Sequence, residues 1–139
     1  MKKLFDKQDL IYICSPLSAP TKEEIRKNMA GAKYYSWFVA VEFGGRTIAP
    51  HSFLPEYLDD HIPQERQVAL DFGLSILKIC KALVVCGDIM SSGMAGEIRK
   101  ARSLGIKVYR LRITGEKEDL REMEASEDEL QICEDHISK

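Results

Sequence analysis

Four short apolar runs alternate with amphipathic stretches along this chain, and this order restricts its fold more than any other feature of the sequence. The runs predict buried strands, and the stretches between them carry apolar residues at spacings of three and four, as helices do. Strands are expected at residues 10–14, 46–49, 83–86 and 106–111, and helices at 22–43, 64–80 and 94–104. Strands that alternate with helices form a mostly parallel sheet with helices on both faces. The sequence therefore predicts an α/β fold, a Rossmann-like or flavodoxin-like three-layer α/β/α arrangement with four to five strands.

Charged residues are distributed unevenly along the chain. The 139 residues include 20 Lys and Arg against 22 Asp and Glu, for a net charge of -2. Residues 114–139 hold ten acids and three bases, so residues 1–113 carry a net charge of +5. This excess suits a small anionic ligand such as a phosphate, but it is too weak for a nucleic-acid-binding protein. We expect one domain at 1–113 and an acidic C-terminal tail at 114–139 that is helical over part of 117–133.

The cysteines and the first residues indicate a reducing environment. No C-x-x-C motif occurs, and no histidine lies at metal-ligand spacing from a cysteine, so no metal and no cofactor are expected. Cys14, Cys80 and Cys86 lie in or beside apolar runs, where free cysteine behaves as a small hydrophobe. Residues 1–10 are polar and charged, unlike a signal peptide, and the longest apolar run, 82–86, is far too short to cross a bilayer. These features favour a soluble, cytoplasmic protein with no membrane partner.

Small and polar residues follow three of the predicted strands. Ligands of parallel sheets bind at the carboxyl ends of the strands, which here are Ser15-Pro16, Pro50-His51 and residues 87–93. The third of these turns precedes a helix start, where unpaired backbone N–H groups and the helix dipole attract an anion. Ser91 and Ser92 add hydroxyl donors for a phosphate, although Ser92 is equally well explained as an N-cap.

Four side chains near these turns are suited to chemistry. Glu97, in the first turn of the predicted helix, either stabilises the helix dipole or projects into the ligand crevice. The small residues around it favour the crevice, because glycine weakens a helix unless something approaches the backbone closely. Tyr12 is ordinarily a core residue, but near the end of a strand it can hold a carboxylate or a ligand. His51 and Asp88 end the second and third strands, where each is either structural or an acid–base group.

Two common nucleotide-binding motifs are absent from the sequence. No G-x-G-x-x-G follows the first strand, and no G-x-x-x-x-G-K-[ST] occurs. The absence of these motifs disfavours classical dinucleotide-dependent dehydrogenases and P-loop NTPases.

Four segments, taken in order, resemble a known group of enzymes. They read Ile-Tyr-Ile-Cys-Ser-Pro at 11–16, Ala-Pro-His at 49–51, Val-Val-Cys-Gly-Asp at 84–88 and Ser-Gly-Met-Ala-Gly-Glu-Ile at 92–98. Over roughly residues 10–111 the chain resembles the nucleoside 2-deoxyribosyltransferase-like superfamily. The resemblance is greatest to its uncharacterised bacterial and phage branch, described mainly as a domain of unknown function.

The resemblance implies cleavage of the N-glycosidic bond of a nucleoside or nucleoside 5′-monophosphate. Glu97 is then the nucleophile, oriented by Tyr12, and the covalent glycosyl-enzyme is resolved by water in a hydrolase or by a second base in a transferase. Relatives carry an aspartate where this chain has Gly73, so Asp88 or His51 is expected to protonate the departing base. The residues expected to contact the substrate are Ser15, Pro16, His51, Ser91, Ser92, Gly93 and Met94.

Two other functions stay open at this point. A non-catalytic nucleotide-binding protein, acting as a sensor or sponge for a nucleotide signal, would use the same crevice with Glu97 contacting only a ribose hydroxyl. The departure at Gly73 favours this alternative. A structural or partner-binding module would instead act through the acidic tail. In the first two cases the partner is a small-molecule nucleoside or nucleotide and not a nucleic acid polymer.

The predicted helix 22–43 carries more apolar surface than one face of a sheet can cover. Tyr34, Tyr35, Trp37 and Phe38 follow one another at successive angles around it. Relatives also assemble. We therefore expect a homodimer or a higher homo-oligomer.

Overall fold

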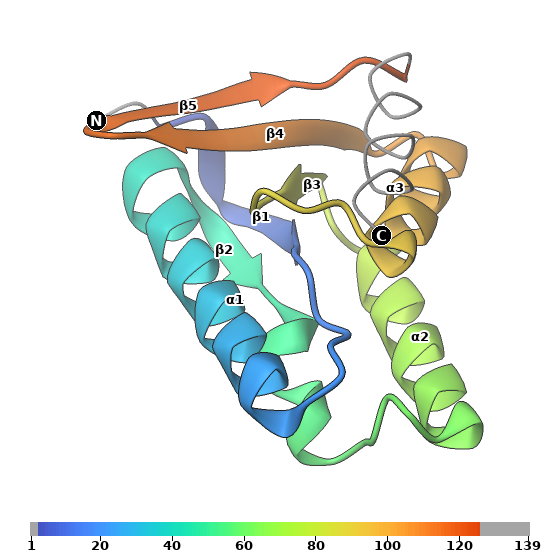
Figure 1. The fold of residues 1–139 in the computed structure, drawn as a ribbon. Helices are drawn as coiled ribbons and strands as arrows, with labels where there is room; N and C mark the ends of the chain where they lie inside the picture. Colours follow the sequence, from blue (N-terminus) through green and yellow to red (C-terminus); the bar gives the residue numbers. More distant parts are fainter. Residues whose placement is uncertain (1–2, 126–139) are drawn as a thin grey trace.

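The computed structural model describes residues 3–125, and a five-stranded sheet forms the middle of the fold (Figure 1). The strands are β1 (Phe5–Cys14), β2 (Gly44–Ile48), β3 (Ala82–Val85), β4 (Lys107–Thr114) and β5 (Lys117–Glu122). They lie in the order β2-β1-β3-β4-β5. The first four strands are parallel, and β5 runs antiparallel to β4. The predicted mostly parallel sheet of four to five strands is confirmed.

Helices cover both faces of this sheet. The helix α1 (Lys22–Phe43) packs on one face, and α2 (Pro63–Leu77) and α3 (Ser92–Ser103) pack on the other. The alternation of β1 shows the division, because Ile11 and Ile13 join the core under α1 while Tyr12 and Cys14 join the core under α2 and α3. The three-layer α/β/α arrangement predicted from the alternating pattern is therefore present.

Both ends of α1 follow from the local sequence. Thr21 is the N-cap, and its hydroxyl accepts a hydrogen bond from the backbone N–H of Glu24 at 3.2 Å. Gly44 ends the helix with a φ of 90°, which an L side chain rarely adopts, and its N–H bonds to the carbonyl of Val39. The chain then enters β2 directly.

The segment after β4 differs from the expected one. Residues 117–122 form the strand β5, so the prediction of helix is wrong for these residues. Gly115, with a φ of 60°, turns the chain back, and Leu120 pairs opposite Leu111. Five of the six residues of β5 are charged and exposed, so the sequence shows little of the apolar alternation that would reveal a strand. The sheet thus continues past residue 113, and the rest of the predicted tail helix lies outside the described residues.

Two short 3-10 turns join β2 to α2. They are Pro50–Ser52 and Leu54–Glu56, in the stretch expected to be a loop or short helix. Within residues 3–125, no helix combines the length and the apolar character needed to cross a membrane.

Candidate active site

A cavity of about 580 Å³ lies between α2 and α3 and reaches the turn that follows β2. It opens where the carboxyl ends of the parallel strands lead into the helices, as expected for this fold. Side chains from β1, from the turns after β1 and β2, and from α2 and α3 surround it. The lining residues are Tyr12, Leu17, Pro50, His51, Leu54, Asp60, Arg66, Gln67, Ala69, Leu70, Gly73, Leu74, Ser92, Gly93, Gly96, Glu97, Arg99, Lys100 and Ser103.

Tyr12 and Glu97 meet at the wall of this cavity. The Tyr12 hydroxyl donates a short hydrogen bond to Oε2 of Glu97, and the two residues are 1% and 8% exposed. Burial, reinforced by the Glu97 charge, raises the pKa of Tyr12 well above its usual value. The phenol therefore stays protonated and acts as a donor. A strand residue and a helix residue 85 positions apart thus form a fixed donor–carboxylate pair.

Cys14 is a second donor to the same carboxylate, and sequence reasoning missed it. Its thiol lies 3.5 Å from Oε1 of Glu97. Burial, followed by the charge of Glu97, raises the pKa of Cys14, so the sulfur keeps its proton. Spacing could have revealed this contact, because residues two apart on a strand point to the same face and Tyr12 was already assigned to the site. The two donors of β1 thus engage both oxygens of Glu97.

Gly73 lies against this pair from the α2 side. A Cβ added to Gly73 would lie 2.9 Å from the Tyr12 hydroxyl oxygen and 3.9 Å from Oε2 of Glu97. A side chain at position 73 would therefore lie next to the carboxylate, but the phenol occupies the space that it would need. Asp71, two residues earlier, is exposed, accepts a hydrogen bond from Gln67 at 2.9 Å and does not line the cavity.

His51 lines the cavity in a defined orientation. Its Nδ1 lies 2.7 Å from the carbonyl oxygen of Ser15. A carbonyl only accepts hydrogen bonds, so Nδ1 carries the proton and Nε2 is left for a ligand or solvent. Ser15 itself is 1% exposed, and its hydroxyl has no hydrogen-bond partner among residues 3–125. Pro16 packs beside Gly87, and neither Ser15 nor Pro16 lines the cavity.

The start of α3 divides the predicted phosphate loop into two groups. Ser91 is the N-cap and accepts a hydrogen bond from the N–H of Met94 at 3.2 Å, so Ser92 is the first helical residue and not the cap. Ser92 and Gly93 line the cavity, whereas Ser91 does not and Met94 is fully buried in the core. Because the helix begins two residues earlier than expected, Glu97 lies in its second turn and not in its first.

Asp88 lies apart from the cavity. It is exposed, in the turn between β3 and α3, and does not belong to the lining. Its charge acts on Tyr35 of α1, whose pKa is raised chiefly by burial and then by Cys86 and Asp88. The structure therefore brings together Tyr12, Glu97 and His51, but not Asp88.

The charges of the lining are only partly balanced. Asp60 accepts hydrogen bonds from Ser18 and from Arg66, the latter at 3.1 Å, so these two lining charges neutralise each other. Arg99 and Lys100 form no ion pair with any residue between 3 and 125. No group of three or more His, Cys, Asp or Glu in that part of the chain lies close enough to hold a metal ion.

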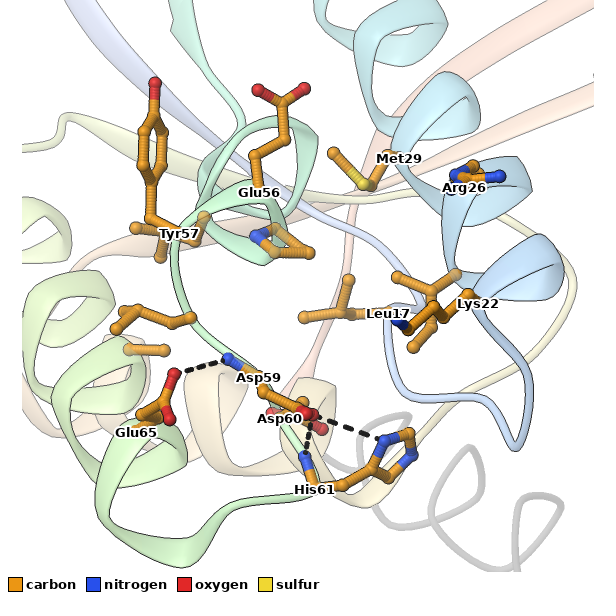
Figure 2. A pocket seen from close by; sticks show the side chains of 15 residues that line it. Leu17, Lys22, Arg26, Met29, Glu56, Tyr57, Asp59, Asp60, His61 and Glu65 are labelled. Carbon is orange, nitrogen blue, oxygen red and sulfur yellow. Dashed lines mark hydrogen bonds and ion pairs between the residues drawn. The ribbon is translucent and has the colours of Figure 1, made fainter.

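A second cavity of about 620 Å³ adjoins the first, with which it shares four lining residues, and Figure 2 shows the side chains around it. Lys22, Arg26 and Met29 of α1 line one side of it, and residues 54–61 line the other. In that segment the Asp59 carboxylate lies 3.4 Å from Nδ1 of His61. The residues common to both cavities are Leu17, Leu54, Asp60 and Ala69.

Three comparisons place the chain among known proteins. A solved structure, the 2-deoxyribosyltransferase of the psychrotolerant bacterium Bacillus psychrosaccharolyticus, superposes with a TM-score of 0.54 at 23% identity, over 78% of this chain and 75% of that chain. No curated protein matches the chain. The expected resemblance to the nucleoside 2-deoxyribosyltransferase-like superfamily is thus confirmed at the level of the fold. The sequence profile of DUF7768, a domain of unknown function, matches residues 9–111, and the chain therefore belongs to the DUF7768 family.

Proposed function

We propose that the protein cleaves the N-glycosidic bond of a nucleoside or nucleoside 5′-monophosphate, as a hydrolase or 2-deoxyribosyltransferase. The observation that carries this proposal is the Tyr12–Glu97 pair at the wall of a nucleotide-sized cavity. A carboxylate held by a phenol that keeps its own proton is oriented for attack.

The reaction runs in two displacements. A Glu97 carboxylate oxygen forms a bond to the anomeric carbon of the sugar while the bond from that carbon to the base nitrogen breaks, and its electron pair leaves with the base. A proton then neutralises the departing base. In the second displacement, water or another base attacks the same carbon, and the ester bond to Glu97 breaks. Water gives a free sugar, and a second base gives a new nucleoside.

His51 is the proton donor that the geometry favours. Its Nδ1 is fixed on the carbonyl of Ser15, so in the protonated ring Nε2–H is the group available to the cavity. Asp88, the other candidate from the sequence, does not line the cavity. The phosphate of a nucleoside 5′-monophosphate binds at Ser92 and Gly93, where the start of α3 offers backbone N–H groups and a hydroxyl.

The test is base release from a panel of nucleosides and 5′-monophosphates, followed by chromatography, with and without a second base in the reaction. Glu97→Gln keeps the shape of the side chain but removes its charge, so it should bind ligand without releasing base. Glu116→Gln, at an exposed turn outside the cavity, is the matched control and should retain full activity. A 2-fluoro-2-deoxyribosyl substrate should leave an adduct on the peptide that contains Glu97. Full base release by Glu97→Gln would refute this mechanism.

A non-catalytic nucleotide sensor or sponge is the second candidate. The specific observation in its favour is Gly73, which leaves the cavity without the acid that relatives place beside the carboxylate. Tight binding of a nucleotide with no base released from any member of the panel would establish this function in place of catalysis.

We also propose that the chain assembles as a homodimer or larger oligomer through α1. Tyr34, Trp37 and Val41 lie at helical spacing on this helix and are 47%, 60% and 40% exposed. Tyr34 also packs on Trp37 and Phe38, so the exposed aromatic surface is continuous. Light scattering at micromolar concentration should give the mass of at least two chains, and Trp37→Glu should reduce it. A monomeric mass for the unmodified chain would contradict the proposal.

A further inference from the structure

The candidate active-site cavity extends well beyond the residues that the proposed reaction uses. Along α3 the lining runs from Ser92 to Ser103, the full 12 residues of the helix, which span about 16 Å. Glu97 lies near the middle of this length. In the proposed function the phosphate occupies the Ser92 end and the sugar lies at Glu97, so about 9 Å of lined helix beyond Glu97 has no assigned ligand group.

Both helices wall this part of the cavity. Gly96, one turn before Lys100, lines the cavity beside Glu97, and a Cβ added there would meet no atom within 4 Å, so space lies directly against the helix backbone. Leu74 of α2 lies on the opposite, apolar side, and Leu70 lines the cavity one turn earlier on the same helix. The helices α2 and α3 both start at the carboxyl edge of the sheet. Leu74 therefore lies farther from that edge than Gly73, and Lys100 lies farther from it than Glu97.

The charges at this end are unbalanced. Arg66 is neutralised by Asp60 at 3.1 Å, and the Glu97 carboxylate is engaged by Tyr12 and Cys14. Arg99 and half-buried Lys100 therefore remain as the two lining cations without an acidic partner among residues 3–125. Two adjacent cations in a cavity wall attract an anionic group, and phosphate suits both.

We propose that Arg99 and Lys100 form a second anion subsite, and that the ligand is a nucleotide with two separated phosphate groups. One phosphate binds at the start of α3, the sugar lies at Glu97, and the second phosphate reaches Arg99 and Lys100. A nucleoside 3′,5′-bisphosphate and a 5′-phosphorylated dinucleotide both have this chemistry. The dinucleotide adds a second base to pack on Leu74. This inference rests on the proposed function, because it takes the sugar position from Glu97.

The test is calorimetric titration of the protein with three ligands: adenosine 5′-monophosphate, adenosine 3′,5′-bisphosphate and the dinucleotide pApA. Titrations are repeated in Glu97→Gln to remove turnover. We expect the two doubly phosphorylated ligands to bind about tenfold more tightly than the monophosphate, an advantage that shrinks at high salt. Whichever of these two ligands gains more affinity over the monophosphate identifies whether the second phosphate belongs to a bisphosphate or to a dinucleotide.

Charge-removal variants locate the effect. Arg99→Gln/Lys100→Gln should bind the monophosphate unchanged but lose the tenfold advantage. Lys78→Gln/Lys81→Gln removes the same charge from exposed positions outside the cavity and should keep the advantage. Equal affinity for all three ligands, or an advantage that survives in Arg99→Gln/Lys100→Gln, would overturn the second subsite alone. Failure of every nucleotide to bind the unmodified protein would overturn the proposed function as well.

Discussion

Replacing Gly73 by alanine tests how tightly the carboxylate site is packed. In the interior of α2 the substitution by itself stabilises the helix by about 1 kcal/mol. The new methyl carbon, however, would lie 2.9 Å from the Tyr12 hydroxyl oxygen, closer than such atoms normally approach. If the core strains to keep the phenol in place, the strain costs about 1–3 kcal/mol of stability. If Tyr12 moves instead, the loss of its hydrogen bond to Glu97 costs about 1.5–3 kcal/mol.

Only one of these two costs applies, so after the gain in helix propensity the net loss of stability is about 0–2 kcal/mol. Gly31→Ala is the matched control, because its methyl group would meet its nearest atom, in Tyr35, at an ordinary 3.9 Å. Gly31→Ala should therefore be more stable by the difference in helix propensity between glycine and alanine, with no opposing steric cost. Urea unfolding followed by circular dichroism should therefore separate the two variants by about 1–3 kcal/mol. If Gly73→Ala is as stable as Gly31→Ala and releases base at the unmodified rate, the tight packing inferred for Tyr12 is wrong.

Three further predictions concern the buried donors. Tyr12→Phe removes one hydrogen bond to a charged group, worth about 1.5–3 kcal/mol, so base release should fall about 10- to 100-fold while circular dichroism stays unchanged. Cys14→Val removes the thiol donor to Glu97 and should lower the rate of base release, whereas Cys14→Ser should restore it; equal rates in Cys14→Val and the unmodified chain would exclude a role for the thiol. Burial raises the pKa of Cys80 from 9.0 to about 11, so the folded protein holds this proton more tightly than the unfolded chain. The stability that follows is complete below pH 9 and is lost as the pH rises toward 11; urea unfolding at pH 8 and 10.5 should show the decline, and a decline as steep in Cys80→Ala would argue against this source.

Local patterns were sufficient for the parallel core of the fold. The run at 10–14 predicts the buried end of β1, and Thr21 and Gly44 mark the two ends of α1. The first half of β1 was not predicted, because its exposed residues are charged and the register shifts between Phe5 and Leu10. An edge strand or an irregular strand is stabilised largely by hydrogen bonds to the backbone of its neighbour. Its own side chains therefore need not follow the apolar pattern from which strands are predicted.

The candidate site was predictable only where the sheet topology fixes it. Strand ends and the start of a helix must converge in a parallel fold, which explains why Tyr12, His51 and Glu97 were found. The sheet topology does not fix the path of the chain within each turn. The N-cap at Ser91 instead of Ser92 depends on a single backbone hydrogen bond, and the position of Asp88 outside the cavity depends on the path of one loop. The Cys14 contact, in contrast, could have been predicted, because Cys14 lies two residues after Tyr12 and therefore on the same face of β1.

The strand β5 also bears on how copies of this chain avoid joining one another wrongly. It ends the strand order of the described sheet, and an outermost strand exposes backbone groups that can pair with a strand of another molecule. Alternating charges occupy this border, including an exposed Asp119–Arg121 ion pair at 3.1 Å. A second chain adding there would have to match those charges and strip their water. Growth of the sheet from molecule to molecule is therefore disfavoured at β5.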